Sequence, residues 1–84
     1  MITVYSSDWC PFCTNAKRLL DHKGVKYTEI KVDNQPRIRA QMIELSGRTS
    51  VPQIFIDEKH IGGCDDLYAL EREGQLDTLI SQQD

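Results

Sequence analysis

The strongest constraint on the fold is a strand that leads into a proline-initiated helix and is followed by another strand. Ile2–Ser6 alternates apolar and polar residues, which is typical of a short strand. Pro11 suits the first turn of a helix, and apolar residues then recur at helical spacing until Gly24. Residues 25–32 predict a second strand. Such a unit implies a right-handed crossover and two parallel strands.

The remainder of the chain predicts a helix, a hairpin and a helical C-terminal part. The pattern indicates a helix from Pro36 that Gly47 ends, strands at 53–57 and 59–62, a helix capped by Asp65 that runs to about Glu73, and a short helix around 76–80. The order βαβ-α-ββ-α(α) predicts an α/β protein with a four-stranded mixed sheet flanked by helices. This is the layout of the thioredoxin fold, and we expect residues 1–84 to form one such domain.

Composition narrows the range of partners and compartments. The formal net charge is −3, which argues against a general nucleic-acid binder. The longest apolar stretch, around Val51–Ile56, is far shorter than a membrane span. No basic residue precedes Lys17, so we expect no secretory signal. Three cysteines are too few for a disulfide framework, and we expect a cytoplasmic location.

The pair Cys10 and Cys13 falls where the first strand is expected to meet the first helix. Positions three apart share one face of a helix, so the two sulfur atoms can meet. Cys10 would lie at the N-cap, where backbone N–H groups lack intrahelical partners and favour a thiolate. Cys13 would lie inside the first turn, less exposed, and would keep a higher pKa.

The free energy needed to stabilise a Cys10 thiolate can be compared with what the helix dipole and backbone amides supply. A free thiol with a pKa of about 8.5 is only about 3% ionised at pH 7. Lowering the pKa to roughly 5 takes about 4–5 kcal/mol, whereas the helix dipole offers about 0.3–2 kcal/mol. Hydrogen bonds to a charged acceptor add about 1.5–3 kcal/mol each, so amides such as those of Phe12 and Cys13 must contribute. We therefore expect Cys10 to be the nucleophile and Cys13 the resolving thiol in disulfide exchange.

Two other interpretations of the cysteine pair stay open. The pair could be half of a structural zinc site, but such a site takes four ligands. The remaining candidates, Cys64, His22 and His60, are scattered singly along the chain. The pair could also be chemically inert. We expect no metal site, and we expect both histidines at the surface or at a strand edge.

Three separated segments carry a family resemblance. They are Tyr5 with residues 10–20, then residues 47–56 (Gly-Arg-Thr-Ser-Val-Pro-Gln-Ile-Phe-Ile), and then residues 60–67 (His-Ile-Gly-Gly-Cys-Asp-Asp-Leu). One Cys-x-x-Cys motif is a moderate signal, whereas three motifs in this order and spacing are a strong one. Over nearly its whole length the chain resembles the glutaredoxin family, most closely the small bacterial dithiol members.

The resemblance implies a binding site for glutathione. In glutaredoxins the proline that matches Pro52 is cis and faces the cysteines, and the residue that matches Val51 pairs its backbone with the cysteine part of glutathione. By the same analogy Asp65 takes the ammonium of the γ-glutamyl end. Amides at Cys64, Asp65 and Asp66 take its carboxylate at a helix N-terminus. We expect Cys64 to pack its sulfur and to bind ligand only through its backbone.

Four further side chains are weaker candidates for this site. Tyr5 and Phe12 would flank the tripeptide, or would simply belong to the core or the rim. Lys17 and Arg37 would meet the glycyl carboxylate, or would be solvated helix charges. The sequence does not decide between the two roles at any of these four positions.

Two positions depart from the family pattern. Many glutaredoxins carry a lysine at the position of Ser7, where it touches both the thiolate and the glycyl carboxylate. Its replacement by serine, with Asp8 following, predicts a smaller lowering of the Cys10 pKa and weaker glutathione binding. Trp9 replaces a smaller residue, and the sequence leaves open whether it plugs a half-buried gap or offers an apolar platform to protein substrates.

The activity that the resemblance implies is glutathione-dependent thiol–disulfide exchange on protein–glutathione mixed disulfides and protein disulfides. Glutathione would be a co-substrate rather than a permanent cofactor, the protein a monomer, and ribonucleotide reductase a candidate recipient of electrons. Two alternatives stay open. One is a hydrogen donor recharged by thioredoxin reductase, which the loss of the lysine at Ser7 favours. The other is a dimer that shares an iron–sulfur cluster through Cys10 and glutathione, which Pro11 and Cys13 argue against.

Overall fold

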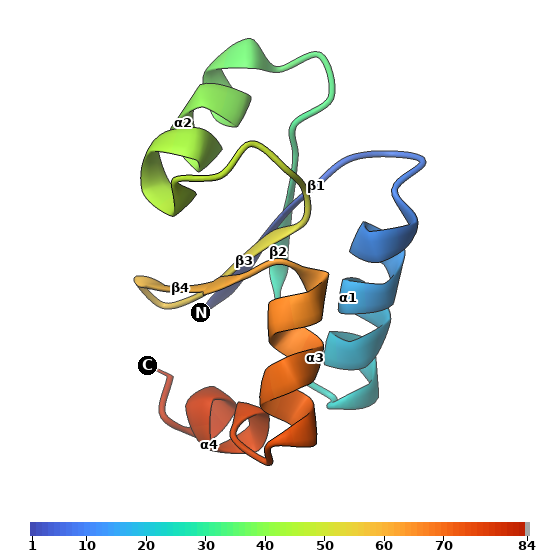
Figure 1. Cartoon of the computed structure of the whole chain (residues 1–84), viewed down its shortest axis with the longest axis vertical. Coiled ribbons are helices and arrows are strands. Elements are labelled where there is room, and N and C mark those ends of the chain that lie inside the picture. Colours follow the sequence, from blue (N-terminus) through green and yellow to red (C-terminus); the bar gives the residue numbers. More distant parts are fainter. Residues whose placement is uncertain (84) are drawn as a thin grey trace.

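The computed structural model describes residues 1–83 (Figure 1). The elements of this part follow one another as β1 (Ile2–Ser6), α1 (Pro11–His22), β2 (Thr28–Lys31), α2 (Pro36–Ser46), β3 (Gln53–Ile56), β4 (Lys59–Gly62), α3 (Cys64–Arg72) and α4 (Leu76–Ser81). This order confirms the one predicted from the apolar periodicity and the helix-ending glycines. Gly24 and Gly47, which were expected to end α1 and α2, have φ values of 71° and 72° in the left-handed region.

The four strands form one mixed sheet in the order β2-β1-β3-β4. β1 runs parallel to β2 and antiparallel to β3, and β4 pairs antiparallel with β3. The parallel pair is connected through α1, while β3 and β4 form a hairpin. The structure thus confirms the mixed sheet of the thioredoxin fold. It also places the loop after β1, which carries the first cysteine, next to the loop that enters β3.

Helices cover both faces of the sheet (Figure 1). Residues of a strand point alternately to its two sides, so apolar side chains on each side form a core that helices cover. The larger core lies beneath α1, α3 and α4 and contains Ile2, Val4, Ala16, Leu19, Leu20, Ile54, Ile56, Cys64, Leu67 and Leu76. The smaller core lies beneath α2 and contains Tyr5, Val32, Met42 and Phe55. These two cores hold the start of α1 and the loop before β3 against the same end of the sheet.

Two predicted boundaries are wrong by more than one residue. β2 begins at Thr28 instead of residue 25, because the amide of Val25 donates to Leu20 O at the end of α1 while the pairing with β1 starts at Thr28. Asp65 does not cap α3. Gly63 is the N-cap, and the carboxylate of Asp66 accepts its N–H at 2.9 Å.

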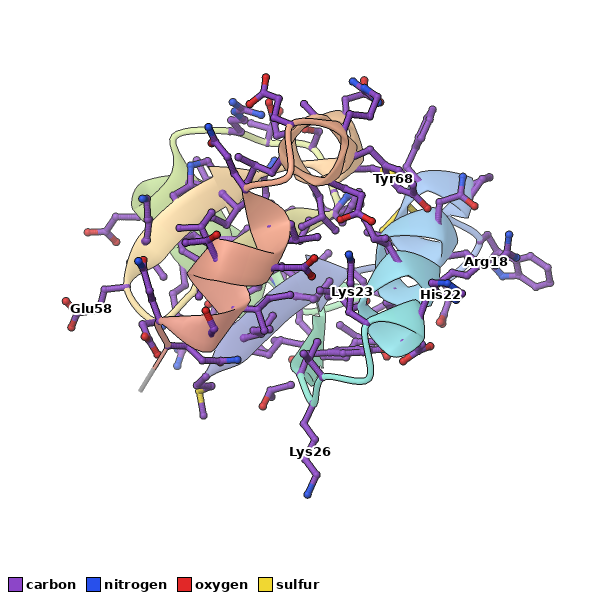
Figure 2. All side chains as sticks on the ribbon, turned by 90° about the horizontal axis from the view of Figure 1, so that it is seen from below. Arg18, His22, Lys23, Lys26, Glu58 and Tyr68 are labelled. Atoms are coloured by element: carbon purple, nitrogen blue, oxygen red, sulfur yellow. A yellow bond between two sulfur atoms is a disulfide. The ribbon has the colours of Figure 1, made fainter. Side chains whose placement is uncertain are left out.

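Three polar contacts, made by the side chains of Tyr68 and Lys23, connect the C-terminal helices to α1 and the residue that follows it (Figure 2). The hydroxyl of Tyr68 on α3 donates to the carbonyl oxygen of Asn15 at 3.0 Å. Lys23, which follows α1, pairs with Glu71 of α3 at 2.6 Å and with Asp77 of α4 at 3.0 Å. These two carboxylates raise the pKa of Lys23. The contacts keep α1 and α3 aligned, so that their N-terminal ends meet at the cysteine pair.

Candidate active site

Cys10 lies at the N-terminus of α1, as the sequence predicts. Its backbone is extended, and its sulfur accepts the N–H of Cys13 at 3.1 Å. Of the two amides expected to stabilise a thiolate here, the structure gives this bond to Cys13. The two cysteines are joined by a disulfide, with their Cα atoms 5.2 Å apart. The spacing of three residues therefore brings the sulfurs together as the helical geometry requires.

The two sulfur atoms differ in access. Cys13 is buried in the first turn of α1, with 1% of its surface exposed, whereas Cys10 is only half-buried. A substrate can therefore reach the sulfur of Cys10 but not that of Cys13. The predicted difference in exposure is confirmed, and the roles of nucleophile and resolving thiol remain predictions that this arrangement favours.

The loop before β3 faces the cysteine pair. The Val51–Pro52 peptide bond is cis, as the resemblance implied. The carbonyl oxygen of Val51 lies 3.8 Å from the sulfur of Cys10, within reach of a thiol hydrogen when the pair is reduced. Pro52 itself is buried. The backbone of this loop is thus presented beside the reactive sulfur.

Gln53 holds this loop from inside the protein, a role that its position in the sequence did not predict. Its side chain is fully buried, and its amide nitrogen donates to the carbonyl oxygen of Ser50 at 3.0 Å. Its amide oxygen lies 2.7 Å from Nε2 of His60 on β4. Burial, helped by the charge of Arg48, lowers the pKa of His60 and favours the neutral ring. The only sequence signal was a polar residue that opens an otherwise apolar strand.

The start of α3 forms the other wall of the site. The carboxylate of Asp66 accepts the N–H of Gly63 and a hydrogen bond from Nη1 of Arg48 at 2.8 Å. The hydrogen bond from Gly63, followed by the one from Arg48, lowers the pKa of Asp66. Gly63 also approaches the proline loop closely, since a Cβ at this position would lie 3.4 Å from the carbonyl oxygen of Pro52.

A groove of about 230 Å³ opens between the first turn of α1, the loop before β3 and the start of α3. Six of the residues expected at a glutathione site line it: Phe12, Val51, Pro52, Cys64, Asp65 and Asp66. Three residues that were not among the predicted site residues complete the lining: Arg48, Ser50 and Gly63. Arg48 could not be assigned from sequence spacing, because its partner Asp66 is 18 residues away along the chain.

Three expected residues are not among those that line the groove. Tyr5 is 5% exposed in the smaller core, where its ring meets that of Phe55 edge-on at 5.9 Å, because its place in β1 points it toward α2. Lys17 pairs with Glu29 of β2 at 2.7 Å. Arg37 is exposed on α2. These three residues therefore do not line this groove, and a contact of any of them with glutathione stays a prediction.

Cys64 packs its side chain as predicted, with 8% of its surface exposed in the larger core. Burial, followed by the nearby charge of Asp65, raises the pKa of its thiol. The sulfur of Cys64 thus stays protonated at neutral pH, which suits the prediction that this residue binds ligand only through its backbone.

The pH dependence of stability is expected to report the contacts of Asp66. A carboxyl group whose pKa is lowered by folding stabilises the native state above its ordinary pKa of about 3.9. That contribution is lost as the pH falls through the lowered pKa. The variant Asp66→Asn should therefore be less stable than the parent at pH 7, and the difference should shrink below about pH 4. Urea denaturation at a series of pH values measures it.

The matched control for this experiment is Asp65→Asn, which removes the same charge from the exposed neighbouring position. A gap between Asp66→Asn and the parent that stays constant from pH 7 to pH 2, or that the control reproduces in full, would contradict the prediction.

The cysteine pair at the start of a helix, facing a cis-proline loop, defines a thiol–disulfide oxidoreductase of thioredoxin fold. Comparison with known proteins makes this more specific. The family model described as "Glutaredoxin" matches residues 2–61. The chain therefore belongs to the glutaredoxin family, and the family's members are thiol–disulfide oxidoreductases.

Individual relatives agree with this assignment. Glutaredoxin 3 of Escherichia coli strain K12 is 53% identical over 79 residues, which cover 94% of this chain and 95% of that protein. A glutaredoxin of Pseudomonas aeruginosa is 52% identical over 80 residues, or 95% of each chain. Among solved structures, a buckwheat glutaredoxin–glutathione complex has a TM-score of 0.90 at 33% identity, covering 96% of this chain and 76% of the other.

Proposed function

We propose that the protein is a glutathione-dependent oxidoreductase that reduces protein–glutathione mixed disulfides. The observation that carries the proposal is the position of the Cys10 sulfur, which accepts the Cys13 amide at the helix N-terminus and lies beside the groove. The Cys10 thiolate attacks the glutathione sulfur of the mixed disulfide, and the protein thiolate leaves and takes up a proton. A second glutathione thiolate then attacks the Cys10–glutathione disulfide, which releases oxidised glutathione and restores the Cys10 thiolate.

For a protein disulfide, the same residues support a two-thiol route. Cys10 forms a mixed disulfide with the substrate, and Cys13 then attacks Cys10 to close the internal disulfide and release the second substrate thiolate. Two molecules of glutathione reduce the internal disulfide and leave as oxidised glutathione. Because the Cys13 sulfur is buried but bonded to Cys10, it is suited to this step and not to external attack.

The groove supports a specific set of glutathione contacts. The backbone of Val51 would pair with the cysteine part of glutathione, while the exposed carboxylate of Asp65 would take its ammonium group. Free amides at the start of α3, near Cys64 and Asp66, would take the α-carboxylate. Arg48 adds a cation to the same wall of the groove.

The cellular setting is part of the same proposal. None of the helices within residues 1–83 has both the length and the apolar content of a membrane span. We place the protein in the cytoplasm as a monomer, with glutathionylated or disulfide-containing proteins as substrates and ribonucleotide reductase as a candidate among them.

The experiment that tests the function is a coupled assay on a small glutathione mixed disulfide, in which the formation of oxidised glutathione is followed. We expect turnover with reduced glutathione as the electron source. Turnover only when thioredoxin reductase supplies the electrons would instead assign the protein to the hydrogen donors that this enzyme recharges. A visible absorbance after anaerobic purification would favour the cluster-binding dimer.

A further inference from the structure

Trp9, the residue before Cys10, is a prominent feature of the site that the proposed function leaves unused. Its side chain is 100% exposed. Its backbone has a φ of 57°, in the left-handed region that bulky residues rarely adopt. The structure therefore excludes the half-buried plug and leaves one of the largest apolar side chains in water, beside the reactive sulfur. The fold gains no burial from this arrangement.

A second hollow lies beside Trp9. It has a volume of about 500 Å³, and its walls include Val32, Asp33, Pro36 and Arg39 at the end of β2 and the start of α2. It shares no lining residue with the groove described above. Trp9 lines the second hollow and Phe12 lines the groove. Cys10, which lies between these two residues in the chain, therefore lies between the hollow and the groove. A substrate disulfide at Cys10 can thus place one partner on each side.

The charges around Trp9 balance one another. Asp8 pairs with Lys31 and donates its N–H to the carboxylate of Asp33 at 2.7 Å. The guanidinium of Arg39 donates to the carbonyl oxygen of Thr49 at 3.3 Å. These two carboxylates and two cations carry no net charge. The indole is therefore the dominant recognition element of this side, and it fits an uncharged apolar side chain better than a charged one.

We propose that Trp9 determines substrate specificity by packing against an apolar side chain next to the cysteine of a polypeptide substrate. This inference rests on the proposed function, because it assumes that glutathione occupies the groove on the Phe12 side. The polypeptide part of the mixed disulfide then extends over Trp9. Tryptophan is among the residues that most often dominate the binding energy of an interface.

A trapped complex tests the contact directly. In the variant Cys13→Ser, Cys10 can hold a stable mixed disulfide, and Trp9 is the single tryptophan of the chain, so its fluorescence reports its surroundings. We expect a blue shift of the emission when the attached peptide carries leucine beside its cysteine. The shift should be smaller with glutamate in that position and absent with glutathione alone. A fully formed leucine-peptide complex without a shift would overturn the inference, whereas failure to form any mixed disulfide would contradict the proposed function instead.

Kinetics supply the second test. We expect Trp9→Ala to lower the ratio of kcat/KM on a glutathionylated leucine peptide to kcat/KM on a small glutathione disulfide by about tenfold. Trp9→Phe should restore most of the ratio. Leu45→Ala, which truncates another exposed apolar residue in a separate hollow on α2, is the matched control and should leave it unchanged. An unchanged ratio in Trp9→Ala, or self-association of the parent that this variant abolishes, would overturn the inference.

Discussion

Replacing Cys10 with serine is expected to reduce turnover of a small glutathione mixed disulfide at least about a thousandfold. A serine hydroxyl is not ionised near neutral pH, so neither the helix N-terminus nor the Cys13 amide can make it a competent nucleophile. Replacing Cys13 with serine should lower the same activity by less than about tenfold, because this reaction needs one thiol only. The coupled assay for oxidised glutathione measures both variants.

With a protein disulfide as substrate, we expect the variant Cys13→Ser to lose its activity. Without the resolving thiol, the mixed disulfide between Cys10 and the protein persists, and mass spectrometry should find it as a covalent adduct. Equal loss of activity in both variants on the small substrate would reject the one-thiol step. Unimpaired reduction of a protein disulfide by Cys13→Ser would reject the resolving role of the buried cysteine.

Gly62→Ala is expected to destabilise the protein by about 2–4 kcal/mol and to weaken glutathione binding. Gly62 has a φ of 123°, a conformation that side chains rarely permit. A Cβ at this position would also come within 2.3 Å of Oδ2 of Asp66. The carboxylate would have to move, and its bonds to Gly63 and Arg48 would be lost with it. Urea denaturation and calorimetric titration with glutathione measure the two effects.

Gly24→Ala is the matched control for this prediction. Gly24 has a φ of 71°, but a Cβ there would meet nothing within 4 Å, so this variant isolates the backbone cost. The double variant Gly62→Ala/Asp66→Ala removes the overlap and should therefore lose less than the sum of its single changes. If Gly62→Ala is no less stable than Gly24→Ala and binds glutathione like the parent, the position of the Asp66 carboxylate at the start of α3 does not support glutathione binding.

The fold could be predicted because its signals are local. Proline at the start of two helices, glycine at their ends and the alternation in β1 each specify a few neighbouring residues. The predicted second strand was too long because Val25 and Tyr27 are apolar, yet they pack on the larger core from a loop. Apolar residues can be buried without belonging to a strand.

The site was predictable only where the chain itself carries the geometry. The spacing of Cys10 and Cys13 indicated their meeting, whereas the bonds of Gln53 to Ser50 and His60 depend on how a loop and two strands come together. The cap of α3 was assigned to Asp65, whereas Gly63 is the N-cap and the neighbouring Asp66 accepts its N–H, because adjacent aspartates give the same signal. Which of the two carboxylates accepts the N–H of the N-cap residue depends on where the helix begins.

The two outer strands of the sheet bear on how copies of the protein meet one another. β2 and β4 are each four residues long, and each carries an exposed lysine, Lys31 and Lys59. Short edges with charged side chains oppose lateral hydrogen bonding between sheets, because a second strand would have to displace water from those charges. We therefore expect these edges to resist the open-ended stacking of sheets that leads to aggregates.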